Sequence, residues 1–139
     1  MRKILFIFIL FIAYFNANAG NIRLIGTWGF AIDPVHKTVN ITGDKMENVE
    51  EGNYNTIIKV KLLLTEKPFS GDKETGFIIG ESDFEPLLVF KSYENIDKTS
   101  DFLMMPPPGS YNVVIIVEEL TTDGYIITDY RNFDEKVKF

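Results

Sequence analysis

The 139-residue sequence contains no cysteine and only one histidine, and these two scarcities narrow its chemistry first. Without cysteine the chain has no disulfide, no thiol nucleophile and no thiolate ligand for zinc or an iron–sulfur cluster. His36 would have to serve in any Ser-His-Asp arrangement, and the sequence has no Gly-x-Ser-x-Gly motif around a nucleophilic serine. We therefore expect a protein that is not an enzyme and that carries no cofactor.

Basic residues are also in short supply. The sequence has 14 Lys and Arg residues against 20 Asp and Glu residues, for a net charge of −6. Proteins that bind nucleic acid neutralise phosphates with clustered cations, so the acidic balance argues against nucleic acid as a partner. The 45% hydrophobic content argues against a disordered chain, and the length is that of one domain.

The first apolar run has the layout of an export signal. Arg2 and Lys3 precede a run from Ile4 to Phe15, which is shorter than the roughly 20 apolar residues that a membrane-spanning helix needs. Small residues follow at 16–19 in the spacing that signal peptidases accept. The sequence therefore predicts a signal peptide over residues 1–19, a single mature domain over residues 20–139, delivery to the periplasm or the exterior, and no stable membrane anchor after cleavage.

Alternation of apolar and polar residues is the main structural signal in the rest of the chain. A period of two is typical of strands with one buried face. It predicts strands over residues 35–42, 57–65, 111–118 and 125–133. Weaker signals predict shorter strands over residues 22–32, 77–81, 87–93 and 99–104.

Turn composition separates several of these runs. Turns are expected at residues 43–44, 70–72, 106–109 and 123–124, where glycine, proline and aspartate gather. Residues 45–51 and 94–100 hold a helical turn each at most. The whole pattern predicts an all-β antiparallel sandwich of about seven or eight strands, with a small β-barrel as the alternative.

Four stretches carry a resemblance to a known module. They are a leucine-rich strand that ends in Pro-Phe-Ser-Gly, a glycine-flanked strand, a Pro-Pro-Gly-Ser-Tyr segment and an Asp-Tyr-Arg-Asn-Phe segment, at residues 61–71, 76–81, 107–111 and 129–133. Together they are similar to an immunoglobulin-like β-sandwich module of secreted bacterial proteins, which is often appended to extracellular hydrolases. The resemblance implies an immunoglobulin-like fold and an extracellular accessory role, and it implies no catalytic residues.

Two sets of side chains are candidates for binding. Aromatic rings are enriched at interfaces, so exposed rings could stack on a sugar or a peptide, and the candidates are Trp28, Tyr93, Tyr125 and Tyr130. A weak calcium candidate consists of three carboxylates on one side of an extended segment, Glu81, Asp83 and Glu85. These three lack the spacing of a calcium-binding loop, so we favour a solvated acidic rim and assign no metal site.

The sequence therefore favours binding over catalysis. The leading hypothesis is an exported interaction module that contacts another protein, or a second copy of itself, in the envelope or outside the cell. Edge strands of a sandwich offer unpaired backbone groups for such contacts. The alternative is a carbohydrate-binding module that uses exposed aromatic rings. A small hydrolase is the third hypothesis, and it requires His36 or paired carboxylates in a concave pocket.

Overall fold

The computed structural model describes residues 21–49, 57–71, 76–88 and 90–139, and the signal peptide predicted over residues 1–19 lies outside them. The described residues form seven strands and no helix. The strands are β1 (Ile22–Asp33), β2 (Thr38–Asn48), β3 (Ile58–Thr65), β4 (Phe77–Phe84), β5 (Ser92–Asp101), β6 (Ser110–Thr121) and β7 (Gly124–Lys138).

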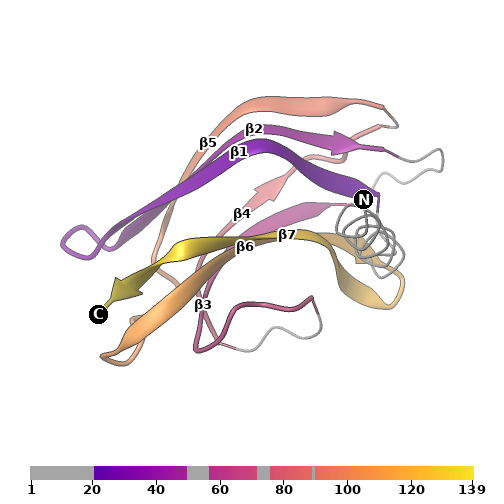
Figure 1. Cartoon of the computed structure of the whole chain (residues 1–139). Helices are drawn as coiled ribbons and strands as arrows, with labels where there is room; N and C mark the ends of the chain where they lie inside the picture. Colours follow the sequence, from indigo (N-terminus) through magenta and orange to yellow (C-terminus); the bar gives the residue numbers. More distant parts are fainter. Residues whose placement is uncertain (1–20, 50–56, 72–75, 89) are drawn as a thin grey trace, which may run out of the picture.

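The strands make two separate antiparallel sheets. One has the order β1-β2-β5 and the other has the order β4-β3-β6-β7. Figure 1 shows the three-stranded sheet lying over the four-stranded sheet. The sheets do not close on each other, so the fold is the predicted all-β sandwich and not the small barrel that was its alternative.

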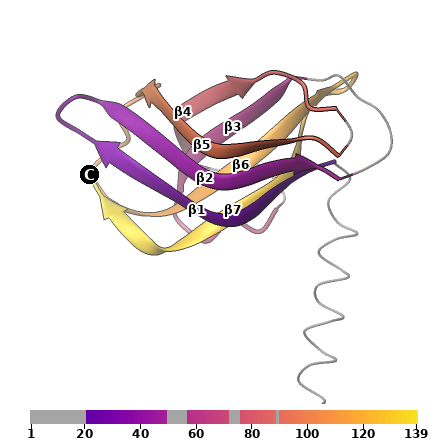
Figure 2. The ribbon, with the colours of Figure 1, turned by 90° about the horizontal axis from the view of Figure 1, so that it is seen from above.

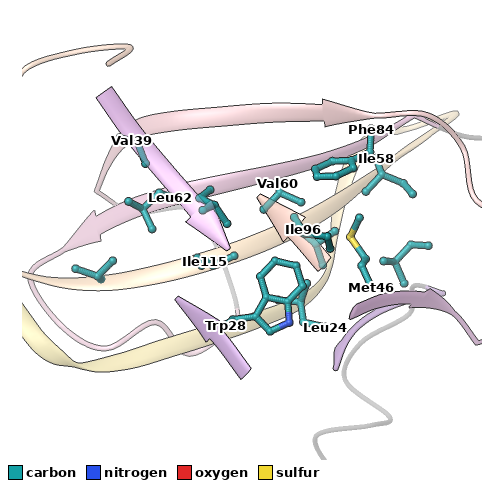
Figure 3. Close-up of a cluster of buried hydrophobic side chains, with 14 of the residues drawn as sticks. Leu24, Trp28, Val39, Met46, Ile58, Val60, Leu62, Phe84, Ile96 and Ile115 are labelled. Carbon is teal, nitrogen blue, oxygen red and sulfur yellow. The ribbon is translucent and has the colours of Figure 1, made fainter. Parts of the chain in front are cut away.

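The main core lies between the two sheets because each contributes one apolar face. Side chains from both sheets meet there in Figure 3, among them Trp28, Met46, Leu62 and Ile115. Met46 and Leu62 are fully buried. Burial of this apolar surface is the main force that holds the sheets together.

A second, smaller apolar cluster covers part of the outer face of the four-stranded sheet. Its buried members are Leu63, Val114 and Ile116 from the sheet and Phe69 from the β3–β4 connection. Phe69 packs edge-on against Tyr130, with 4.9 Å between ring centroids. Asn132 fixes Phe69 by bonding both its backbone N–H and its carbonyl. Strands β3 and β6 are therefore buried on both faces, which explains their nearly continuous apolar runs.

The structure corrects the start of the second strand. Residues 34–37 form the turn of the β1–β2 hairpin, and the strand begins at Thr38 and not at residue 35. Lys37 in this turn has φ 55°, in the left-handed region. His36 consequently lies at an exposed hairpin tip and not on the polar face of a strand. The strand start predicted at residue 35 was wrong, because residues in a turn can alternate between apolar and polar by chance.

The turn expected at residues 43–44 is also wrong, because both residues lie inside β2. Gly43 does not reverse the chain; its lack of a side chain leaves room for a neighbouring ring. A Cβ atom at this position would lie 2.5 Å from the ring of Trp28, which pairs with Gly43 across the strands. Glycine is thus the residue that lets the indole lie flat against the β2 backbone.

Three other expectations need correction. The described residues of 45–51 continue β2 as far as Asn48, and residues 94–100 belong to β5, so neither segment is a helical turn. The separate strands expected over residues 87–93 and 99–104 are parts of the single strand β5 and its flanks. The strands expected over residues 22–32, 57–65 and 77–81 are confirmed within one to three residues, and so is the β6–β7 hairpin at Gly124.

Candidate functional site

The two lateral sides of the sandwich place very different groups next to each other. On one side, which we call the closed side, the edge strands β1 and β7 lie together (Figure 2). On the other, which we call the open side, the edge strands β4 and β5 face each other. Edge strands carry unpaired backbone groups, so each side is a place where a sandwich can accept another chain.

Carboxylates of the four-stranded sheet bind the backbone of β1 on the closed side. Asp129 accepts a hydrogen bond from the N–H of Leu24, with 2.9 Å between Oδ2 and N. Glu119 accepts from the N–H groups of Asn21 and Ile22, each at 2.9 Å from Oε1. Both carboxylates are buried. Their carboxylate oxygens accept hydrogen bonds from backbone N–H groups that the carbonyls of a neighbouring strand would otherwise accept.

Two arginines complete the closed side. Arg131 donates to the carbonyls of Leu24 and Gly26, at 2.9 and 3.1 Å. Arg23 reaches in the opposite direction and donates to the carbonyl of Thr128 at 3.0 Å. Side chains therefore satisfy the outward backbone groups of β1 near its start, which blocks this edge against strand addition.

In the part of the chain that the structure describes, fewer hydrogen bonds join the two sheets on the open side. One backbone hydrogen bond crosses from the N–H of Leu103 to the carbonyl of Ile79 in β4, at 3.0 Å. Lys98 of β5 places its ammonium 5.2 Å from the ring centroid of Phe84. Tyr93 also packs on Phe84, and its hydroxyl donates to the carbonyl of Glu85 at 2.7 Å. Burial of the phenol raises the pKa of Tyr93, and the charge of Glu85 adds to this rise.

The connection from β5 to β6 on this side exposes three consecutive large apolar side chains. We call Leu103, Met104 and Met105 the methionine segment, and their exposed fractions are 54%, 39% and 51%. Such residues are commonly buried in a soluble domain, and neighbouring exposed ones mark contact surfaces more often than scattered ones do. Methionine is itself enriched at protein interfaces because its flexible thioether adapts to a partner's shape.

Hydrogen bonds fix the chain before and after the methionine segment. The N–H of Phe102 donates to the carbonyl of Lys37 at 2.8 Å, and the N–H of Leu103 donates to Ile79. After the segment come three prolines, at residues 106–108. The hydroxyl of Tyr111 donates back to the carbonyl of Pro107 at 2.5 Å. The segment is thus held before any partner binds, which lowers the entropy cost of binding.

A second exposed apolar pair lies at the opposite end of β5. Leu88 and Phe90 flank position 89, which lies outside the described residues. The buried Asn48 holds this connection, because its carbonyl accepts from the N–H of Phe90 and its amide donates to the carbonyl of Leu87, both at 2.9 Å. Phe90 has φ 60°, a strained conformation for a residue with a bulky side chain.

The four aromatic residues singled out from the sequence do not form one binding platform. Trp28 is 5% exposed and belongs to the core, so it offers no indole face to a ligand. Tyr93 packs on Phe84, and Tyr130 packs on Phe69. Tyr125 is the most exposed of the four, and the ammonium of Lys59 lies 4.8 Å from its ring centroid.

The carboxylates considered for calcium have other neighbours. Glu81 and Asp83 lie 3.6 and 3.8 Å from the ammonium of Lys59. Glu85 lies beyond the end of β4, where its carbonyl accepts the Tyr93 hydroxyl. Among the residues that the structure describes, no group of three or more acidic or histidine side chains is arranged to hold a metal ion.

The single histidine forms an exposed pair with an aspartate. Nδ1 of His36 lies 2.7 Å from Oδ2 of Asp33 at the tip of the β1–β2 hairpin. Asp33 also accepts from the backbone N–H groups of Val35 and His36, each at 3.0 Å. The hydrogen bonds from His36, first from its backbone and then from its ring, lower the pKa of Asp33. The pair is open to water and acts mainly as the closure of the turn.

Sequence reasoning interpreted Leu103, Met104 and Met105 as a strand end that runs into a fixed turn, and it assigned the two methionines no redox role. The run of three prolines directly after Met105 indicated the turn, but not that the side chains before it are exposed. Proline removes a backbone donor and pushes the preceding residue out of regular pairing. Large apolar residues just before such a run therefore fall in a connection, where burial is harder to achieve.

Within the described residues, no helix combines the length and the apolar character needed to cross a membrane. Comparison of the chain with protein-family models, curated proteins and solved structures found no match.

Proposed function

We propose that this protein is an exported, noncatalytic binding module of the immunoglobulin-like class, which contacts another protein in the envelope or outside the cell. The strand order supports the class. The first, second and fifth strands share one sheet and the third, sixth and seventh share the other, as in immunoglobulin-like sandwiches, while the fourth strand pairs with the third and not with the first sheet. The bond from the Tyr111 hydroxyl back to Pro107, at the start of the sixth strand, resembles the tyrosine corner of that class and supports the proposal.

The exposure of the methionine segment is the observation that carries the proposed activity. Leu103, Met104 and Met105 are exposed together, and the chain on both sides of them is fixed by hydrogen bonds. A soluble domain gains nothing in stability from holding three such side chains in water. Their exposure is accounted for when a partner covers them in the working complex.

A protein is a better fit to this surface than a glycan. The methionine segment has apolar side chains without an aromatic ring, and sugars are bound chiefly by flat rings together with polar groups. The four aromatic candidates lie in separate surroundings and share no ring contact among the described residues. The proposal therefore commits to a protein surface with an apolar patch or groove.

Site-specific photo-cross-linking tests the proposal. A photo-reactive phenylalanine at position 104 is exposed to light in cells that export the protein, and the same residue at position 125 is the matched control on another exposed surface. We expect a defined protein adduct from position 104 only. Excess unlabelled protein should suppress the adduct, and the double variant Met104→Gln, Met105→Gln should suppress it at least about tenfold less well, because lost apolar burial weakens binding.

Three results would contradict the proposal. Equal labelling from positions 104 and 125 would show that the methionine segment is not a specific contact surface. An adduct that contains only carbohydrate would favour the glycan alternative. Retention of residues 1–19 in the protein recovered outside the cytoplasm, read by intact mass, would refute the predicted signal cleavage.

A further inference from the structure

We propose that Met104 and Met105 form an oxidation-sensitive switch, in which conversion to methionine sulfoxide turns the methionine segment from an apolar surface into a polar one. The effect on binding rests on the proposed function, while the selectivity of the oxidation does not. The proposal follows from three observations, which concern exposure, competing groups and conformation.

The methionines of the described residues differ sharply in exposure. Met104 and Met105 are 39% and 51% exposed, whereas Met46 is 0% exposed in the core. Oxidation of methionine depends on access of the oxidant to the sulfur. An oxidant reaches Met46 only when the domain opens. The folded protein therefore protects Met46 from oxidation and leaves Met104 and Met105 accessible.

The chain has no side chain that would react before these methionines. It contains no cysteine, the residue that two-electron oxidants attack first when it is present as a thiolate. A peroxide that reaches this protein therefore meets the two exposed thioethers as its most reactive accessible groups. If the protein is exported as proposed, it has no thiol of its own that would consume peroxide before the methionines react.

The reaction needs one oxidant molecule for each methionine. The thioether sulfur takes one oxygen atom from hydrogen peroxide and gives up two electrons, and the peroxide's other oxygen leaves as water. The reverse step needs a thiol-dependent sulfoxide reductase, whose dithiol becomes a disulfide while the sulfoxide oxygen leaves as water. The protein backbone is unchanged in both directions, so the surface can be switched off and restored.

The place of these methionines in the fold suits a switch that leaves the domain intact. The segment lies in a connection whose chain is fixed by the Phe102, Leu103 and Tyr111 hydrogen bonds. These bonds use backbone atoms and a tyrosine hydroxyl, and none uses a methionine sulfur. Oxidation therefore changes the polarity of the surface without removing a bond that holds the sandwich together.

The first experiment measures selectivity without any partner. The exported protein is treated with graded hydrogen peroxide, and sulfoxide is measured on each methionine in tryptic peptides, which separate Met46 from the other two. We expect Met104 and Met105 to oxidise at least about tenfold faster than Met46 in the folded protein, with the difference largely lost in urea. Equal rates in the folded protein, or faster oxidation of Met46, would overturn the proposal.

The second experiment measures the consequence for the surface. Oxidised protein should elute earlier from a hydrophobic-interaction column than untreated protein, while its thermal unfolding stays unchanged. The variant Met104→Leu, Met105→Leu keeps similar apolar volume without a thioether, so peroxide should not shift its elution. An equal shift in this variant would place the effect on other residues and overturn the switch.

The third experiment joins oxidation to binding. We expect peroxide to suppress the ability of the wild-type protein to compete for the cross-link from position 104, and sulfoxide reductase to restore it. The leucine variant should compete before and after peroxide, whereas the glutamine variant should compete at least about tenfold less well in both states. If untreated wild-type protein does not compete, the proposed function fails, and the selectivity and elution results still decide the oxidation chemistry. If the leucine variant loses competition as wild type does, the switch fails while the binding function stands.

Discussion

The two sheets of the sandwich are held together by different interactions on the closed side and on the open side. On the closed side, Glu119, Asp129 and Arg131 reach across from the four-stranded sheet and bond the backbone of β1. On the open side, Lys98 and Tyr93 of β5 pack on Phe84, the Tyr93 hydroxyl donates to the Glu85 carbonyl, and one backbone bond joins Leu103 to β4. The contrast indicates that hydrogen bonds between the sheets are concentrated on the closed side, whereas the exposed methionine segment adjoins the open side.

Burial accounts for the energetic side of this contrast. The acidic groups of the closed side are shielded from water, so their hydrogen bonds to N–H groups are strong and costly to lose. Lys98 on the open side is exposed, and water screens its attraction to the ring. Substitutions on the two sides should therefore differ in how far they lower the free energy of unfolding.

The largest effect is expected from Asp129→Ala on the closed side. The change removes the acceptor of the Tyr130 N–H and leaves the N–H of Leu24 buried without its acceptor, and we expect the free energy of unfolding to fall by about 2–3 kcal/mol. Urea denaturation measures the loss. Asp129→Asn keeps a side-chain oxygen at the same place and should lose about half as much or less. Equal losses for alanine and asparagine would show that this hydrogen bond does not hold the closed side.

The next effect is expected from Tyr111→Phe, in the connection that carries the methionine segment. The ring still packs against Phe77, so only the hydroxyl bond to Pro107 is lost. We expect a loss of about 1 kcal/mol in thermal unfolding and faster proteolysis between residues 103 and 109. Unchanged proteolysis would mean that the corner bond does not hold the methionine segment, and the open side would then be less fixed than its geometry indicates.

Much of the fold could be predicted from the sequence where strands are buried. Strands β3 and β6 carry long apolar runs because both of their faces are covered, and the start of β7 alternates, whereas β1 gave only a weaker signal. Strand β5 could not be recognised in full, because it is an edge strand whose residues Glu94, Asp97 and Lys98 are exposed. Gly43 resembled a turn residue because the reason for it, the ring of Trp28, comes from another strand.

The candidate site was harder to predict than the fold. Exposed tyrosines were the natural choice for a binding surface, but neighbours in other strands decide which rings are covered, as Phe69 does for Tyr130. The methionine segment has the composition of a strand end, and only the crossover between the two sheets leaves it exposed. Contacts between residues far apart in the sequence thus decide which of these side chains are exposed, and the prolines after Met105 indicate only that a connection begins there.

A smaller effect is expected from Lys98→Gln, the counterpart of Asp129→Ala on the open side. The change removes a cation that lies 5.2 Å from the ring of Phe84 and keeps most of the side-chain length. We expect a loss of about 0.5 kcal/mol in urea denaturation, and less in high salt. A loss as large as that of Asp129→Ala would remove the proposed difference between the two sides.

The smallest effect is a pH dependence on the open side, carried by Tyr93. Its pKa lies above the ordinary value of 10.0, because burial disfavours the phenolate and Glu85 repels it. The unfolded chain therefore loses this proton at lower pH than the folded protein does. The resulting contribution to stability is complete below about pH 10 and is lost as the pH rises through the folded pKa. Tyr93→Phe should flatten this decline in alkaline urea denaturation.

Absorbance titration of the phenols checks the same point directly. The difference between the curves of wild-type protein and Tyr93→Phe should show one phenol that ionises later than free tyrosine. Asp33 provides an opposite case at the hairpin tip, since its pKa is lowered and any contribution it makes is lost as the pH falls. If Tyr93 ionises no later than free tyrosine, its ring is more hydrated than its packing on Phe84 implies. The open side would then be looser around Phe84 than the contacts of Tyr93 and Lys98 indicate.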